Sequence, residues 1–179
     1  AVVFENDKVK ISSLPLKHRI PCFGFKFEEK EKPRKLVPKA LEEYAIPNYA
    51  RHELTKGEDF RSEDGVVVKN NLLTTDPEAP KSYAYCSDTA YNAKLIPFLK
   101  EVDLLYHEST FLEKDRKRAT KTFHSTAKDA AQVALEAEAK KLLLGHFSNR
   151  YKSKDAFLQE SRPTFKESYI AEEGMEYLV

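Results

Sequence analysis

Several apolar segments of this 179-residue chain end in a residue that can bind a metal ion. Three of the five histidines, His18, His107 and His146, directly follow such segments. Asp88 follows a fourth, residues 83–86. Imidazole nitrogens and carboxylate oxygens together suit zinc or manganese. Because layered α/β folds gather site residues at strand ends, the pattern favours a metal site there.

Each of these residues also has a plainer interpretation. A single histidine after a strand is usually a packed core or rim residue. Asp88 could cap the short helix expected near Ala93. His107 and Glu108 could form a buried, salt-linked pair under the sheet. The metal site is preferred only because the same placement recurs at several strand ends.

The elements that would position these residues alternate between strands and helices. Short apolar or alternating runs predict strands, at residues 8–16, 23–27, 65–73, 82–86, 103–106, 142–145 and 169–179. Short helices are expected at 93–100 and 156–160. Ser125 and Thr126 are an N-cap signal, with Asp129 three residues beyond Thr126, for an Ala-rich helix that ends near residue 139. This order indicates an α/β layer architecture.

Composition narrows the class of protein. Lys plus Arg is 30 and Asp plus Glu is 29, which excludes a uniformly basic nucleic-acid coat. No apolar run approaches the ~18 residues of a membrane-spanning helix. Cys22 and Cys86 are expected as reduced thiols, so we expect a cytoplasmic chain with no membrane partner. The chain opens on Ala1 inside a strand-like run, which fits a processed chain or a fragment.

Two segments could serve a large partner. Residues 36–60 are a proline-containing helical excursion, which we expect to leave the sheet near Phe27, return at 66–68, and make few contacts with it. Long connections of this kind are commonly functional. Residues 113–128 include six basic residues, which outnumber the acidic Glu113 and Asp115. That excess favours a polyanion, although a solvated loop is the alternative.

Five motifs occur together in one order, and two short segments accompany them. In chain order the motifs are Leu16-Lys17-His18-Arg19 with Phe23-Gly24-Phe25, Tyr85-Cys86-Ser87-Asp88-Thr89, His107-Glu108-Ser109-Thr110-Phe111, Phe123-His124-Ser125-Thr126-Ala127, and Gly145-His146-Phe147-Ser148-Asn149-Arg150-Tyr151. The accompanying segments are Ile46-Pro47-Asn48-Tyr49 and Lys56-Gly57-Glu58. Together they resemble ribonuclease Z, the tRNA 3′-processing endoribonuclease family of the metallo-β-lactamase fold.

The resemblance implies an α/β fold, namely the αββα four-layer sandwich of the metallo-β-lactamase type. Residues 1–179 would be the C-terminal half, with 30–63 inserted as a flexible, helical tRNA-binding arm. It also implies two zinc ions per complete site, a precursor tRNA substrate and a homodimer.

The resemblance further assigns individual roles. His18, Asp88 and His146 would be metal ligands, with Asp88 bridging two zinc ions. His124 would be catalytic, donating a proton to the leaving oxygen, and Glu108 would orient it and keep it charged. Substrate-binding residues would be Ser148 and Arg150.

One defining motif of the family, His-x-His-x-Asp-His, is absent from the chain. It would lie in an N-terminal half and supply four more residues next to the metals. We therefore expect the chain alone to lack about half of the ligands and to be inactive. Two alternatives remain: a related hydrolase of small phosphodiesters or sulfate esters, and a non-catalytic RNA-binding fragment.

Overall fold

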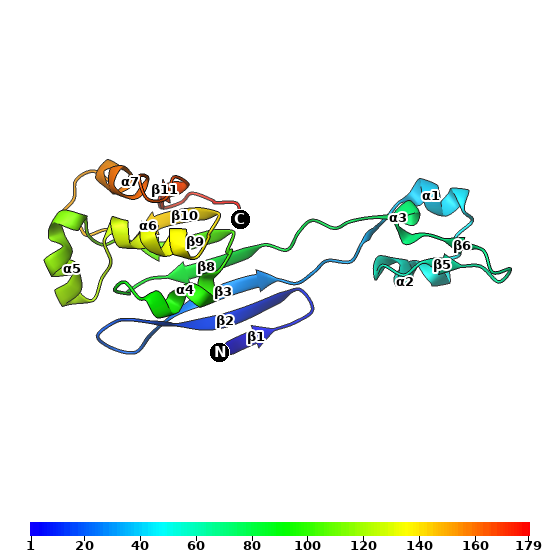
Figure 1. The fold of residues 1–179 in the computed structure, drawn as a ribbon, viewed down its shortest axis with the longest axis horizontal. Helices are drawn as coiled ribbons and strands as arrows, with labels where there is room; N and C mark the ends of the chain where they lie inside the picture. Colours follow the sequence, from blue (N-terminus) through cyan, green and yellow to red (C-terminus); the bar gives the residue numbers. More distant parts are fainter. The chain divides into compact units, whose positions relative to one another are not determined.

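The computed structural model describes residues 1–179, which form two compact units (Figure 1). The first unit combines Ala1–Glu29 with Lys81–Val179, and the second is Lys30–Pro80.

The first unit is built on one seven-stranded sheet in the order β1-β2-β3-β8-β9-β10-β11. Its strands are β1 (Val2–Glu5), β2 (Val9–Leu16), β3 (Cys22–Glu29), β8 (Ser82–Cys86), β9 (Leu104–Glu108), β10 (Lys141–Gly145) and β11 (Ser168–Ile170). The pairs from β1 to β8 are antiparallel, and those from β8 to β11 are parallel. Parallel pairing places the carboxyl ends of β8, β9 and β10 at one edge.

Four helices pack apolar side chains against one face of this sheet, namely η2 (Ala93–Leu95), α4 (Ile96–Leu99), α6 (Ala127–Glu136) and α7 (Asp155–Ser161). Two further helices, η3 (Glu113–Asp115) and α5 (Arg116–Thr122), lie between β9 and α6 in the chain and add no residue to this core. The N-cap prediction for α6 is confirmed, because Thr126 and Asp129 form a reciprocal capping box. Leu105, Leu142 and Leu144 of the sheet join Ala130 and Phe157 in the buried core.

The opposite face of the sheet carries a row of large side chains. Phe25 pairs with Tyr85, Tyr85 with Tyr106, Tyr106 with Leu143, and Leu143 with Tyr169. Residues directly opposite one another across neighbouring strands share a face. Phe25, Tyr85 and Tyr169 remain 39%, 39% and 41% exposed, so this part of the face is open.

The second unit has a small core of its own. Its elements are β4 (Lys35–Leu36), α1 (Pro38–Glu43), η1 (Asn48–Ala50), α2 (Arg51–Thr55), β5 (Phe60–Arg61), β6 (Val67–Val68), α3 (Asn70–Leu73) and β7 (Thr74–Thr75). Buried apolar residues from these elements pack together, including Leu41, Leu54 and Leu73. The buried Asn70 side chain donates to the carbonyls of Leu54 and Glu58, which ties α2 to α3.

Two strand predictions are wrong. Residues 65–73 are not one strand but the two-residue β6 followed by α3. The chain leaves the main sheet after Glu29 and re-enters it at Ser82, so the second unit extends beyond the range 30–63. The second wrong prediction is the strand at residues 169–179, because the observed strand, β11, ends at Ile170. Gly174 has a φ of +78°, which extended strand backbone does not adopt.

No helix in the structure has the length and apolar character that a membrane span requires. Both cysteines are free thiols, and burial raises the pKa of Cys86 to about 12.

Candidate active site

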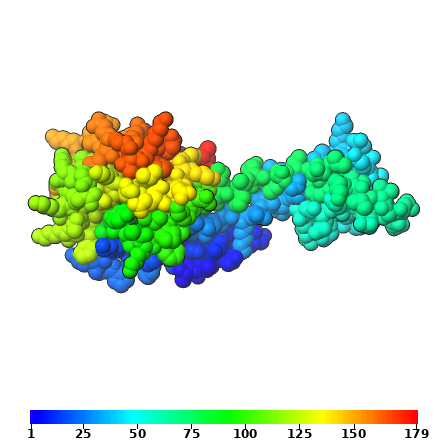
Figure 2. Space-filling view, in the orientation of Figure 1, coloured from blue at the N-terminus to red at the C-terminus, as the bar shows by residue number.

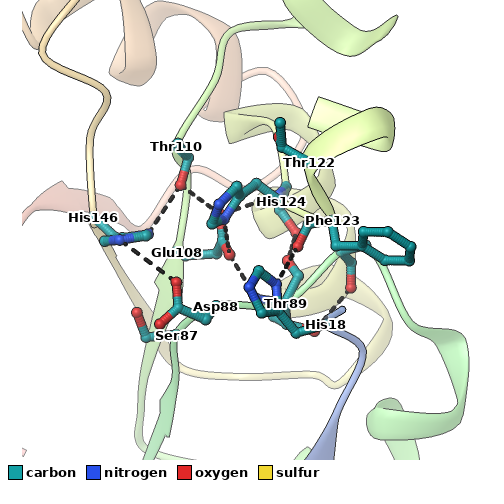
Figure 3. Close-up of polar contacts among 12 residues, drawn as sticks. His18, Ser87, Asp88, Thr89, Glu108, Thr110, Thr122, Phe123, His124 and His146 are labelled. Atoms are coloured by element: carbon teal, nitrogen blue, oxygen red, sulfur yellow. Dashed lines mark hydrogen bonds and ion pairs between the residues drawn. The ribbon is translucent and has the colours of Figure 1, made fainter. Parts of the chain in front are cut away.

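The five residues proposed for metal binding and catalysis lie together at one edge of the sheet (Figure 3). His18 follows β2, Asp88 follows β8, Glu108 ends β9, His124 precedes α6, and His146 follows β10. The ring of His124 lies 5.2 Å from that of His18 and 5.4 Å from that of His146. Nε2 of His146 is 3.6 Å from Oδ1 of Asp88. The sheet therefore gathers side chains from five separate segments.

Glu108 is the central acceptor of the site. Its carboxylate is fully buried and accepts from the backbone N–H groups of Thr89 (2.6 Å) and Ser125 (3.0 Å), from Thr110 Oγ1 (2.6 Å) and from His124 Nδ1 (2.9 Å). Burial alone would raise the pKa of Glu108, but these hydrogen bonds outweigh it and the pKa is lowered. With both oxygens occupied, Glu108 can position its neighbours and has little capacity left for a metal.

His124 is fixed by this carboxylate. Its Nδ1–H donates to Glu108, and this hydrogen bond is the main reason why the pKa of His124 is raised, although burial opposes it. The side chain keeps 17% of its surface exposed. Because Nδ1 is engaged, Nε2 is the ring nitrogen left to exchange a proton with a ligand.

Asp88 and His146 form the candidate metal pair. Two ligand atoms that each bind a tetrahedral zinc at about 2.1 Å are about 3.4 Å from each other. Nε2 of His146 and Oδ1 of Asp88 are 3.6 Å apart. Both residues have left-handed backbone, with φ of 60° and 58°. Such strain in non-glycine residues clusters at functional sites. Donor chemistry and spacing therefore fit a divalent cation.

His18 has the hydrogen bond expected of a metal-binding histidine. Its Nδ1–H donates to the carbonyl oxygen of Phe123 at 3.1 Å, which leaves Nε2 with a lone pair. Metal-binding histidines almost always donate their other nitrogen in this way. Phe123 itself ends α5 in a left-handed conformation, with φ of 59°.

Ser148 and Arg150 lie beside the cluster rather than within it. The Ser148 N–H donates to the carbonyl of Thr110, and Arg150 Nε donates to Ser148 Oγ at 3.3 Å. The Arg150 guanidinium stacks 5.3 Å above the Phe111 ring and lies 3.6 Å from Asp115. A cavity of about 490 Å³ opens here, bordered by His146, Ser148, Lys152 and Lys154.

Most of the basic segment forms α5, which ends at Thr122, two residues before His124. Figure 2 shows this segment, in yellow-green, at the surface of the first unit. Arg116 is engaged by Glu113 and Asp129, whereas Lys117, Arg118 and Lys121 form no ion pair in the structure and remain available to a polyanion.

The plainer interpretation of His107 and Glu108 as a salt-linked pair is wrong. Nδ1 of His107 bonds to the backbone carbonyl of Glu108, while the carboxylate pairs with His124. No role for Thr89 or Thr110 was predicted from the sequence. Both lie inside quoted motifs, but their contacts with Glu108 depend on which strand ends meet in space.

Known proteins resemble this chain in sequence, although no family model matches it. A "Ribonuclease Z" of Porphyromonas gingivalis strain W83 is 47% identical over 175 residues, covering 98% of this chain and 58% of that protein. One from Parabacteroides distasonis is 43% identical with the same coverage. The chain therefore spans somewhat more than half the length of these curated relatives.

Solved structures agree on the fold. The metallo-β-lactamase fold protein YhfI from Bacillus subtilis superposes with a TM-score of 0.62 at 18% identity, over 98% of this chain and 51% of that one. The short form of human tRNase Z gives 0.56 at 22% identity, over 97% and 44%. The sheet and helices of the first unit thus have the metallo-β-lactamase fold. Sequence and fold thus agree over nearly all of the chain, which is similar to the C-terminal part of proteins named ribonuclease Z.

Proposed function

We propose that this chain supplies part of the active site of a zinc-dependent endoribonuclease that removes the 3′ trailer from precursor tRNA. The observation that carries the proposal is the Asp88–His146 pair, whose facing donor atoms lie 3.6 Å apart, beside a His124 whose Nδ1 is hydrogen-bonded to the Glu108 carboxylate. The relatives named ribonuclease Z support the substrate class.

Three residues of the chain would hold metal: His18, Asp88 and His146. When bound, zinc supplies a Lewis acid that offsets phosphate charge and lowers the pKa of water. Three side chains do not close two zinc sites, each of which needs at least four ligands. The remaining ligands would come from the part of the family's length that this chain does not span.

His124 would act on the leaving group. Water adds to the phosphorus and releases one proton to solvent as the bond from phosphorus to the upstream 3′ oxygen breaks. That oxygen takes a proton from Nε2 of His124, which yields a tRNA 3′-hydroxyl and a trailer with a 5′-phosphate. The hydrogen bond to Glu108 raises the pKa of His124 and so favours the protonated ring that donates this proton. Basic residues of α5 and the cavity near Ser148 and Arg150 would hold the flanking phosphates.

The second unit, Lys30–Pro80, would be the arm that grips tRNA outside the active site. The open aromatic row of Phe25, Tyr85 and Tyr169 is a face that the rest of the protein would cover. The complete enzyme would be a cytoplasmic homodimer.

The test is cleavage of a precursor tRNA by the complete gene product, with the chemical ends of both fragments mapped. We expect a 3′-hydroxyl on the tRNA and a 5′-phosphate on the trailer, and loss of cleavage after chelation that zinc restores. A 2′,3′-cyclic phosphate, or cleavage that survives chelation, would contradict the proposal. The isolated chain, tested in parallel, should be inactive.

A further inference from the structure

Thr110 connects the catalytic pair to the candidate metal pair. Its Oγ1 lies 2.6 Å from Oε2 of Glu108 and 3.0 Å from Nδ1 of His146, and the residue is only 8% exposed. We propose that Thr110 is a positioning residue that fixes the tautomer of His146, with the proton on Nδ1 and a lone pair on Nε2.

The direction of the hydroxyl proton follows from the state of Glu108. This carboxylate already accepts from Thr89, Ser125 and His124, and its lowered pKa keeps it ionised. An ionised carboxylate only accepts hydrogen bonds. If the Thr110 proton pointed elsewhere, two oxygens would face each other at 2.6 Å without a hydrogen between them. The hydroxyl therefore donates to Glu108.

The tautomer of His146 follows from that direction. A threonine hydroxyl has one proton, so Oγ1 offers only a lone pair to Nδ1 of His146. Nδ1 must then carry the hydrogen, and Nε2 is left unprotonated in the neutral ring. Because Nε2 lies 3.6 Å from the Asp88 carboxylate, two electron-rich groups face each other, an arrangement that a cation between them satisfies.

Thr110 also holds the segment that carries His146. Its carbonyl accepts the backbone N–H of Ser148 at 3.1 Å. Thr110 therefore contacts both the imidazole ring of His146 and the backbone of Ser148, two residues after His146 in the chain. This double contact helps to maintain the left-handed backbone of His146, whose φ is 58°.

The inference rests on the proposed metal site, but its first readout needs neither metal nor RNA. The complete gene product is labelled with ring-¹⁵N histidine, stripped of metal and studied by NMR at about pH 9, well above the ordinary histidine pKa of about 6.5. The His146 signals are assigned with the variant His146→Gln. We expect the wild-type ring to carry its proton on Nδ1. Thr110→Val should shift population to the Nε2–H form, and Thr110→Ser should restore the wild-type state.

The second readout is zinc affinity, measured by competition with a chromophoric chelator. Thr110→Val should weaken binding about 10–100-fold, the usual effect of removing a partner of a metal ligand, and Thr110→Ser should weaken it much less. Ser168→Ala, which removes another buried hydroxyl of the same unit, should leave zinc affinity and the His146 signals unchanged.

A wild-type His146 with its proton on Nε2, or an unchanged tautomer in Thr110→Val, would overturn the inference. The wild-type spectrum decides this even if the valine variant does not fold. Failure to cleave precursor tRNA, with the expected tautomers observed, would instead count against the proposed function.

Discussion

Nε2 of His146 faces Oδ1 of Asp88 across 3.6 Å, and both residues reach this position through left-handed backbone. That conformation costs roughly 1–2 kcal/mol per L-residue. The two residues follow β10 and β8, the strands on either side of β9, and the strain turns both side chains toward one point. A bound divalent cation would stabilise the arrangement.

The first prediction concerns this pair. Asp88→Asn and His146→Gln should each abolish tight zinc binding by the complete gene product, because each removes one donor of a shared site. Asn70→Ala, in the second unit, is the control and should keep the metal. Elemental analysis after dialysis measures the zinc content. The isolated chain should hold fewer than two zinc ions, and two per chain without any partner would show that further ligands exist in it.

The second prediction separates catalysis from metal binding. His124→Ala should keep its zinc and slow cleavage of precursor tRNA by about 10²–10⁴-fold, the usual contribution of a positioned acid. Its Nδ1 is occupied by Glu108, so it is not expected to hold the metal. Zinc content and single-turnover rates are measured on the same preparation. Loss of metal would make His124 a ligand, and a full rate would make it structural.

Glu108→Gln gives the third prediction. The hydrogen bond from His124 to Glu108 raises the His124 pKa, so a neutral amide should lower that pKa, with burial pushing in the same direction. A general acid works while it is protonated. Cleavage by Glu108→Gln should therefore begin to fall at a lower pH than cleavage by the wild type. NMR titration of the His124 ring measures the change in its pKa, and pH–rate profiles measure the pH at which cleavage falls. If cleavage by Glu108→Gln falls at the same alkaline pH as cleavage by the wild type, Glu108 does not tune a general acid.

The strand-end residues were accessible from sequence for a physical reason. Parallel strands bring their carboxyl ends to one edge, so Asp88, Glu108 and His146 had to approach each other once 82–86, 103–106 and 142–145 were predicted as strands. The role of Thr110 was not accessible, because it depends on rotamers and on which donors reach Glu108.

The extent of the second unit also escaped prediction. Val68 and Leu73 fit a strand pattern, yet both are buried in the separate core of that unit. Short apolar runs do not distinguish a strand from a short buried helix. Alternation at Phe23, Phe25 and Phe27 was a better guide to the strand, because these side chains do share one face of β3, although Phe23 and Phe25 are exposed there and Gly24 on the other face is buried.

The fourth prediction concerns α5. Lys117, Arg118 and Lys121 form no ion pair and stand next to the Phe123–His124 segment. Changing all three to Gln should weaken precursor tRNA binding and reduce the slope of log K against log salt by about 0.7–0.9 for each phosphate that these side chains neutralise in the wild type. Lys8→Gln, at the far end of β2 from His18, is the matched control. Filter binding at several salt concentrations measures the slope, and equal slopes for variant and wild type would show that α5 binds no phosphate.

The fifth prediction concerns the second unit as a tRNA-binding arm. β3 and β8 are antiparallel neighbours, with Glu28 opposite Ser82 and the Glu29 N–H bonded to the Lys81 carbonyl at 2.8 Å. A two-residue Asn-Gly turn can therefore replace Lys30–Pro80 and close a hairpin. The shortened protein should keep its thermal unfolding transition, since the sheet and the core against α6 and α7 are retained.

The consequences for the two kinds of substrate should differ. Hydrolysis of a small phosphodiester needs only the active site, so its rate should change little in the shortened protein. Precursor tRNA should bind far more weakly, because the proposed tRNA-binding arm is gone. The point variant Tyr49→Ala, which removes a side chain that is 75% exposed on the second unit, should reproduce part of that effect. Equal reductions on both substrates, in a protein that is still folded, would mean that residues 30–80 support the active site itself and do not bind tRNA separately.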